Sequence, residues 1–437
     1  MWTYGSRAYN RIFSSNLGGN SMMQYLRNKV MELEREIANR FVANREAIRA
    51  LVLNQLHPRS ASLIRAPRGV GKSTLMLLLL KGITGDDFVV VSGASEVKRG
   101  EVVGRLHIPS LEKEGVERVL WAAFVKSRGK GIDELNRLNP YTTANIHHLM
   151  QFGEVWAYGQ KSKVDDYILI ANENPSDATS FIHPPPFYDR FDICVFLRTL
   201  TLSEKFQLQE MLEKYDWNLV ESMPQILSFD ELQEIRMEVA ATELDAELTG
   251  YINLIVRDFQ SCVRDKESSE IKPPTLCEGC HFIREVCGMI KEPVSERATV
   301  ALINLAKAFK WFYGKCDIDD LFQMALWVFP HRLSLIRTRN ILVDLQNLLE
   351  RERAKMENRR IRRQWALLNE IMKGFDPSIY RLAREAAVED VVFAEELMKI
   401  EDKWINEGLL KQGEDIATQM GWRVRYGSYN YGQWRLK

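Results

Sequence analysis

The sequence has no excess of charge of either sign and no apolar run long enough to cross a membrane. Lys plus Arg and Asp plus Glu both number 59 among 437 residues, so bulk charge favours neither nucleic acid nor a membrane surface as partner. No segment approaches the roughly 20 apolar residues that a spanning helix needs. The opening stretch, "MWTYGSRAYNRIFSSNLGGNSMMQ", lacks the apolar core of a secretory signal. We therefore expect a cytoplasmic protein without a membrane partner.

Cysteine is scarce, with six residues, and structural disulfides are not expected in a reducing compartment. Four of the six lie within 26 residues, and the spacing Cys-x2-Cys among them is typical of metal knuckles. The expected ligands of a Zn²⁺ ion or a [4Fe–4S] cluster are Cys262, Cys277, Cys280 and Cys287. In one alternative, His281 replaces a thiolate; in another, the four cysteines are simply buried in a helical region. Cys194 and Cys316 are expected in the core.

The residues that are present indicate a globular chain of two or three domains, because 437 residues exceed one ordinary core. Residues 1–22 are polar and predict a loose arm. Short apolar strands alternate with helical patterns over 23–202, which predicts an α/β core with a parallel sheet. The pattern is almost wholly helical over 203–337, interpreted as a lid that carries the cysteines. It remains mostly helical over 338–437, interpreted as a C-terminal domain.

The stretch "RAPRGVGKST" has the context of a phosphate-binding loop, because it follows the apolar run "ASLIRAP" and opens a leucine-rich helix. In such a loop, backbone N–H groups and the helix dipole face a polyphosphate. Lys72 is expected to reach the β- and γ-phosphates of ATP, and the Ser73 hydroxyl is expected to ligate Mg²⁺. Ala66 occupies a position that is normally glycine, which is tolerable if its φ is negative. The expected binding residues are Ala66, Pro67, Arg68, Gly69, Val70, Gly71, Lys72, Ser73 and Thr74. The alternative is a tight turn that binds nothing.

Acidic and amide side chains follow two later segments. In "GIDELNR", Asp133 is expected to hold Mg²⁺ through water and Glu134 to act as the base that orients the attacking water. The preceding residues, "KSRGKGI", are poorer in apolar side chains than a central strand should be. In "YILIANENP", Asn174 is the candidate for contact with the γ-phosphate or the water, and Asn172 is the second choice.

The order of "RAPRGVGKST", "IDELNRLNP", "YILIANENP" and "PFYDRFD" resembles MoxR-type AAA+ ATPases, over about residues 25–335. The resemblance implies that Asn174 is the first sensor and that Arg190 is an arginine finger offered to the ATP of a neighbouring subunit. It also implies that Arg297 is the second sensor, at the start of a lid helix. The insertion of this family would correspond to residues 100–115, and its hairpin before the first sensor to "GEVWAYGQKSKVDDY". An ion pair of Arg190 with Asp189 or Asp192 is the structural alternative to the finger.

The function expected from these features is Mg²⁺-dependent ATP hydrolysis that remodels a protein client, in a homo-oligomeric ring that we expect to be hexameric. One alternative is a nucleic-acid-stimulated motor, suggested by the basic "RRIRRQW" and by the aromatic and basic tail "GWRVRYGSYNYGQWRLK". The other alternative is a module that binds nucleotide without turnover.

Overall fold

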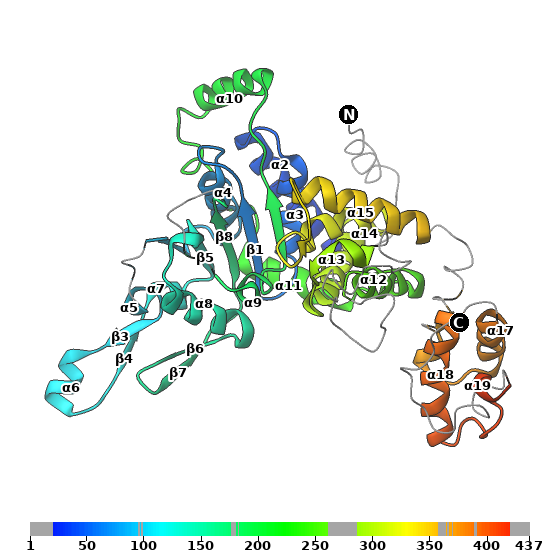
Figure 1. Cartoon of the computed structure of the whole chain (residues 1–437). Coiled ribbons are helices and arrows are strands. Elements are labelled where there is room, and N and C mark those ends of the chain that lie inside the picture. Colours follow the sequence, from blue (N-terminus) through cyan, green and yellow to red (C-terminus); the bar gives the residue numbers. More distant parts are fainter. Residues whose placement is uncertain are drawn as a thin grey trace. The chain divides into compact units, whose positions relative to one another are not determined.

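A computed structural model describes residues 21–94, 97, 99–175, 181, 183–260, 286–356, 364, 367–368, 370–388 and 391–419. It confirms the predicted α/β fold, because its centre is a five-stranded, all-parallel sheet in the order β2-β5-β8-β1-β9 (Figure 1). The strands are β1 (Ser60–Arg65), β2 (Phe88–Ser92), β5 (Gly129–Asp133), β8 (Ile168–Glu173) and β9 (Ile193–Phe196). Since β1 lies between the later strands β8 and β9, the chain reverses its direction of winding beside β1, where open α/β sheets bind ligands.

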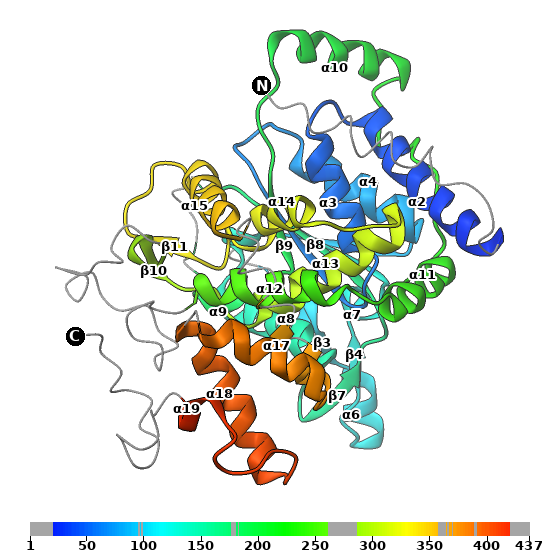
Figure 2. The ribbon, with the colours of Figure 1, turned by 90° about the vertical axis from the view of Figure 1, so that its right-hand side faces the viewer.

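Helices cover both faces of this sheet. On one face α3 packs on β1 and β9, α4 packs on β5 and β8, and α2 packs against both helices (Figure 2). These helices are α2 (Ser21–Arg40), α3 (Arg45–Asn54) and α4 (Lys72–Thr84). The other face buries a cluster that includes Phe124, Ile146 and Phe187 against Leu63 and Leu169 of the sheet. The helices on that side are α5 (Arg99–Val102), α7 (Ala123–Lys126), η1 (Leu135–Arg137), α8 (Pro140–Phe152) and α9 (Pro185–Tyr188).

Strand β5 is central although its sequence, "GKGID", is weak for a strand. Two side chains are absent where α4 and β2 approach: a Cβ on Gly129 would lie 2.5 Å from the Cβ of Phe88, and one on Gly131 would lie 2.8 Å from a methyl of Val90. Lys130 faces the opposite side and is fully buried. Its ammonium donates to the backbone oxygens of Phe124 (2.5 Å), Val125 (3.2 Å) and Ser127 (2.6 Å). The strand is therefore buried through its glycines and through a lysine with three backbone partners.

Two hairpins extend from this core, and the sequence predicts the second of them. One is β3–β4 with the short helix α6 at its tip, and it contains much of the segment expected as an insertion (Figure 1). The other is β6–β7, directly before β8. Their bounds are β3 (Gly104–Leu106), α6 (Ile108–Glu114), β4 (Val119–Trp121), β6 (Glu154–Ala157) and β7 (Gln160–Lys163).

The helical segment before β1 is divided into α2 and α3 by a short break. Ala43 and Asn44 adopt left-handed backbone angles, with φ of 61° and 53°. The side-chain oxygen of Asn44 accepts the N–H of Arg198 at 3.1 Å. Asparagine tolerates this conformation better than most residues, so the helix can break here without glycine or proline.

The chain forms two compact units by its internal contacts: residues 1–242, 300–316 and 327–332 form the first, and residues 243–299, 317–326 and 333–437 form the second. The remaining helices confirm the helical prediction after the sheet. They are α10 (Leu202–Lys214), α11 (Phe229–Ala241), α12 (Ala246–Asp258), η3 (Val286–Met289), α13 (Arg297–Tyr313), α14 (Ile318–Val328), α15 (Ile341–Met356), α17 (Pro377–Val388), α18 (Val391–Asn406) and α19 (Ile416–Gln419). A two-stranded sheet of β10 (Ile290–Glu292) and β11 (Ser334–Leu335) was not expected.

The second unit has its own core where α17 and α18 meet α19. Tyr380, Phe375 and Trp404 pack there with tilted and edge-to-face rings, whose centroids lie 4.9 to 5.8 Å apart, beside the buried Leu397. The basic segment around 357–363 and the tail from 420 onward, on which the nucleic-acid alternative depends, lie outside the described residues.

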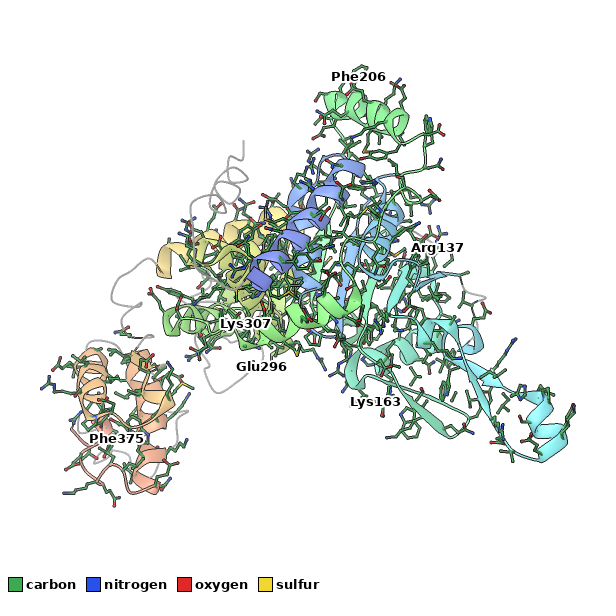
Figure 3. All side chains as sticks on the ribbon, turned by 180° about the vertical axis from the view of Figure 1, so that it is seen from behind. Arg137, Lys163, Phe206, Glu296, Lys307 and Phe375 are labelled. Carbon is green, nitrogen blue, oxygen red and sulfur yellow. The ribbon has the colours of Figure 1, made fainter. Side chains whose placement is uncertain are left out.

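Helix α10 differs from the other long helices because none of its side chains is buried. It stands away from the sheet in Figure 1, and Phe206 projects from it in Figure 3 with 62% of its surface exposed. Among the described residues, no helix combines the length and the apolar character required to cross a membrane.

Candidate nucleotide site

The predicted phosphate-binding loop connects the carboxyl end of β1 to the first turn of α4. Gly69 and Gly71 have φ of 77° and 92°, which L side chains rarely adopt. A Cβ on Gly71 would also lie 2.9 Å from the ring of Phe41. Ala66 is buried and is not among the residues with positive φ, so alanine fits at this position. The loop therefore keeps glycine at the two positions, Gly69 and Gly71, where the backbone has a positive φ.

Ser73 and Asp133 meet at the carboxyl edge of the sheet, as the sequence predicts. The Ser73 hydroxyl donates to Oδ1 of Asp133 at 2.8 Å. A hydroxyl and a carboxylate are oxygen ligands of the type that Mg²⁺ prefers. The pair therefore fits the predicted arrangement, in which Ser73 would ligate the ion and Asp133 would hold it through a water.

Lys72 is turned back onto its own loop. Its ammonium donates to the backbone oxygens of Ala66 (3.0 Å) and Pro67 (2.9 Å). Burial lowers the pKa of Lys72, while the charges of Asp133 and Glu134 oppose that shift. If a phosphate group bound here, the Lys72 ammonium would exchange two neutral carbonyl acceptors for charged phosphate oxygens, which accept stronger hydrogen bonds.

Glu134 is held by its backbone from both neighbouring strands. It has φ of 53°, in the left-handed region. Its N–H donates to the side-chain oxygen of Asn172 on β8 at 3.1 Å. On the side of β2, Gly93 donates to the carbonyl of Asp133 at 2.6 Å, and a Cβ on Gly93 would lie 2.0 Å from the carbonyl oxygen of Glu134. The direction in which the Glu134 carboxylate leaves the sheet is therefore set by residues of three adjacent strands.

The carboxylate of Glu134 pairs with Arg137, at 2.6 Å between Oε2 and Nη1. Both side chains are about one third exposed, at 39% for Glu134 and 31% for Arg137. Exposed ion pairs of this kind contribute roughly 0–1 kcal/mol, so Glu134 can leave Arg137 at little cost. Arg137 is visible near the carboxyl edge in Figure 3.

The two asparagines of "LIANENP" occupy different environments. Asn172 lies inside β8, is fully buried, and its amide binds the Glu134 backbone and approaches the sulfur of Met76 at 3.9 Å. Asn174 follows the end of β8 and is half-buried; its backbone oxygen accepts from the amide of Asn136 at 3.2 Å. The position of Asn174 beyond the strand suits the sensor role expected of it, which stays a prediction.

Arg190 lies at the opposite end of the sheet from the loop. It follows α9 and precedes β9, and the neighbouring Asp192 N–H donates to Ala61 near the start of β1. Ala61 and Ala66 are five residues apart along an extended strand, which corresponds to about 16 Å. Arg190 donates to the backbone oxygen of Pro186 and to the side chain of Gln151. Within one copy of the chain, Arg190 is therefore far from the loop that would hold phosphates.

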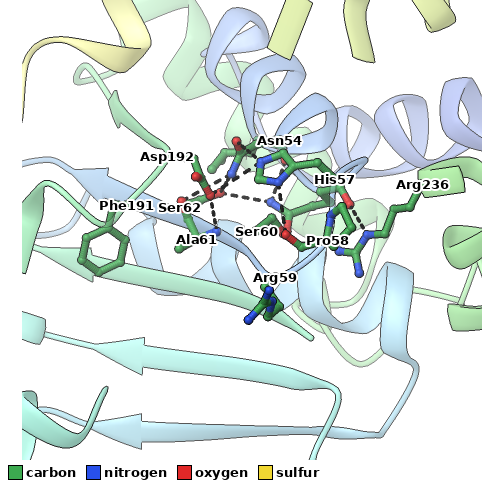
Figure 4. Close-up of polar contacts among 12 residues, drawn as sticks. Asn54, His57, Pro58, Arg59, Ser60, Ala61, Ser62, Phe191, Asp192 and Arg236 are labelled. Carbon is green, nitrogen blue, oxygen red and sulfur yellow. Dashed lines mark hydrogen bonds and ion pairs between the residues drawn. The ribbon is translucent and has the colours of Figure 1, made fainter. Parts of the chain in front are cut away.

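The two carboxylates beside Arg190 bind other groups. Asp189 pairs with the buried Arg332, at 3.3 Å from its Nε. Asp192 accepts the N–H of Ala61 at 2.7 Å and lies 3.6 Å from His57, within the polar network drawn in Figure 4. Sequence reasoning missed Arg332. Its signal is the pair His331-Arg332 inside the otherwise apolar "WVFPHRLSL", since a charge in such a run needs a buried partner.

The other predicted site residues belong to the second unit or lie outside the described residues, apart from Cys194 and Cys316. Arg297 is the first residue of α13 and belongs to the second unit. Cys287 is buried in η3, whereas Cys262, Cys277 and Cys280, together with His281, lie outside the described residues. Cys194 and Cys316 are buried, as predicted.

Comparisons with known proteins agree with this geometry. Residues 63–191 match the family model described as AAA domain (dynein-related subfamily). A crystal structure of a candidate ATPase from Cytophaga hutchinsonii superimposes with a TM-score of 0.59 at 20% identity, covering 75% of this chain and 96% of that one. The comparison with curated proteins finds no match to this sequence. Residues 63–191 thus form an AAA domain, which indicates an ATPase that uses ATP and Mg²⁺.

Proposed function

We propose that the chain is a MoxR-like AAA+ ATPase that works as a homo-oligomeric ring, expected to be a hexamer, and remodels a protein partner. The observation that carries the proposal is the separation of two sets of residues along one sheet. Lys72, Ser73, Asp133 and Glu134 gather at the carboxyl edge, and Arg190 lies at the amino end. A site that needs both sets requires two copies of the chain.

In the proposed reaction, each residue at the carboxyl edge has one task. The N–H groups that open α4 and the Lys72 ammonium bind the β- and γ-phosphates. Ser73 and Asp133 would hold Mg²⁺, which when bound neutralises charge on the phosphates. Glu134 accepts a proton from the attacking water, and Asn174 contacts the γ-phosphate or that water. Arg190 of a second copy stabilises the charge that develops on the transferred phosphoryl group.

Mixing two inactive variants tests the shared site. Lys72→Ala removes the cation that faces the phosphates, so ATP binding should weaken. Arg190→Ala should leave binding nearly intact and lower kcat by a factor on the order of 10³. In the mixture, an intact loop can meet an intact Arg190 of its neighbour, so part of the ATPase activity should return. Activity that stays at the level of the separate variants, with mixed assemblies shown to form, rules out the role in trans.

Protein remodelling is favoured over a nucleic-acid motor by the balanced charge of the chain and by α10, whose apolar Leu202 and Phe206 are 74% and 62% exposed. Exposed apolar side chains on one helix are typical of surfaces that contact proteins. DNA or RNA that raises the ATPase rate, with the increase lost on removal of residues 420–437, would favour the motor instead.

A metal centre of Cys262, Cys277, Cys280 and Cys287 forms part of the proposal, supported by the Cys-x2-Cys spacing. Protein purified without oxygen should contain about one Zn²⁺ per chain, or the iron and brown colour of a [4Fe–4S] cluster. Elemental analysis that finds neither metal removes this part and leaves the ATPase untouched.

A further inference from the structure

We propose that Arg332 is a positioning residue for Arg190: it holds the turn on which Arg190 is presented to a neighbouring copy. This inference rests on the proposed function, because it assigns a task to a residue through the finger role of Arg190. The backbone partners of Arg332 include Asp189, Phe191, Asp192 and Val328, so its proposed effect on the reaction passes through Arg190.

The contacts of Arg332 converge on the residues around Arg190. Its two terminal nitrogens donate to four backbone oxygens: those of Asp192 (2.9 Å) and Val328 (2.6 Å) from Nη1, and those of Phe191 (2.6 Å) and Asp189 (3.3 Å) from Nη2. Three of these four acceptors belong to the residue before Arg190 and to the two residues after it. The guanidinium thus fixes the backbone on both sides of Arg190.

Charge and burial strengthen this arrangement. The Arg332 side chain is 1% exposed and pairs with the Asp189 carboxylate, 12% exposed, at 3.3 Å. A planar guanidinium binds several acceptors in one fixed geometry, which an ammonium cannot reproduce. A turn bound by such a group has few alternative conformations, because each would leave buried oxygens without donors.

Asp192 anchors the other side of the same turn to the sheet. Its carboxylate accepts the N–H of Ala61 at 2.7 Å, and its own N–H donates to the oxygen of Ala61 at 2.8 Å. His331, adjacent to Arg332, brings Nε2 to 2.8 Å from the oxygen of Phe191. Arg190 is therefore carried between two anchored aspartates, one bound to β1 and the other to Arg332.

The test replaces Arg332 by lysine, which keeps the positive charge but lacks the planar guanidinium with its several N–H donors. Because a displacement of about 1 Å can cost about 10²-fold in rate, kcat should fall about 10- to 100-fold while the affinity for a fluorescent ATP analogue stays unchanged. The double variant Arg190→Ala/Arg332→Lys should be no slower than Arg190→Ala alone. Arg49→Lys is the control, since the largely buried Arg49 of α3 pairs with Glu34 of α2 at 3.3 Å and takes no part in the contacts around Asp192; its kcat should remain at the wild-type level.

Mixing experiments then assign the defect to one side of the shared site. Arg332→Lys mixed with Lys72→Ala should regain activity, because the intact loop of the first variant meets an intact finger on the second. Arg332→Lys mixed with Arg190→Ala should regain none. If Arg332→Lys does not fold, Asp189→Asn, which breaks the ion pair at constant size, should behave in the same way.

The outcomes separate the two proposals. Three results would overturn the positioning role and leave the shared site standing. The first is no loss of kcat in Arg332→Lys, and the second is a further loss of kcat in the double variant. The third is that Arg332→Lys mixed with Lys72→Ala recovers no activity, although Arg190→Ala mixed with Lys72→Ala does. No recovery in the mixture of Arg190→Ala with Lys72→Ala would overturn the shared site, and the inference with it.

Discussion

Replacement of Glu134 by glutamine should lower kcat by about 10²- to 10⁴-fold, because the amide cannot accept the proton of the attacking water. ATP binding should stay near the wild-type value, since Lys72 and the loop are unchanged. The backbone bond between Glu134 and Asn172 and the left-handed turn do not involve the carboxylate, so the fold should be preserved. Steady-state ATPase assays and binding of a fluorescent ATP analogue measure the two quantities.

The same variant should accumulate with ATP bound and retain its protein partner on an affinity matrix. Glu385→Gln is a suitable control, because it makes the same change at an exposed position of α17. Wild-type turnover in Glu134→Gln would show that another group activates the water. Retention of a partner that does not depend on ATP, or that persists in Lys72→Ala, would contradict the coupling of hydrolysis to remodelling.

Replacement of Lys130 by methionine should lower the free energy of unfolding by about 2–4 kcal/mol, because buried oxygens of Phe124, Val125 and Ser127 lose their donor. Methionine has a similar length, so packing between the rings of Phe124 and Tyr167 changes little. Lys307→Met is the control: Lys307 has one bond to a backbone oxygen on an exposed surface, and its loss should cost less than about 0.5 kcal/mol. Urea unfolding of the three proteins gives the comparison.

The difference between wild type and Lys130→Met should grow with pH. Burial lowers the pKa of Lys130 to about 7, although the charge of Asp87 opposes the shift. In the unfolded chain the pKa is about 10.4, so between these values the unfolded state binds more protons. The titration of Lys130 therefore raises the free energy of unfolding of the wild type by about 1.4 kcal/mol per pH unit above pH 7. The variant lacks this rise, and a constant difference from pH 6.5 to pH 9 would mean that Lys130 stays charged.

Most of the sheet could be predicted from local patterns, because β1, β2, β8 and β9 are short apolar runs bounded by turns. Strand β5 could not, since its burial depends on missing side chains. Gly129 and Gly131 make room for Phe88 and Val90 in the folded protein, and Lys130 is buried only because a distant segment supplies three carbonyls. This fit between β5 and its neighbouring elements arises only in the folded protein, and it produces no hydrophobic periodicity in the sequence that could predict the strand.

The candidate site divides in the same way. Lys72, Ser73, Asp133 and Glu134 follow recognisable motifs, so their meeting at one edge could be expected from parallel strands. The contact of Asn172 with the backbone of Glu134 depends on which face of β8 its side chain occupies, and motif order does not determine that. Arg332 is 143 residues after Asp189, and no local pattern relates the two.

The distance between Arg190 and the phosphate-binding loop of its own copy also has a genetic meaning under the proposed assembly. A defective Arg190 or Arg332 would leave its own nucleotide pocket intact and disable the pocket of its neighbour. In a cell that makes both normal and altered chains, each altered chain would inactivate a nucleotide site whose other residues belong to a normal neighbouring chain. Mutations at the amino end of the sheet would then act as dominant-negative alleles, and their severity would follow the fraction of altered chains.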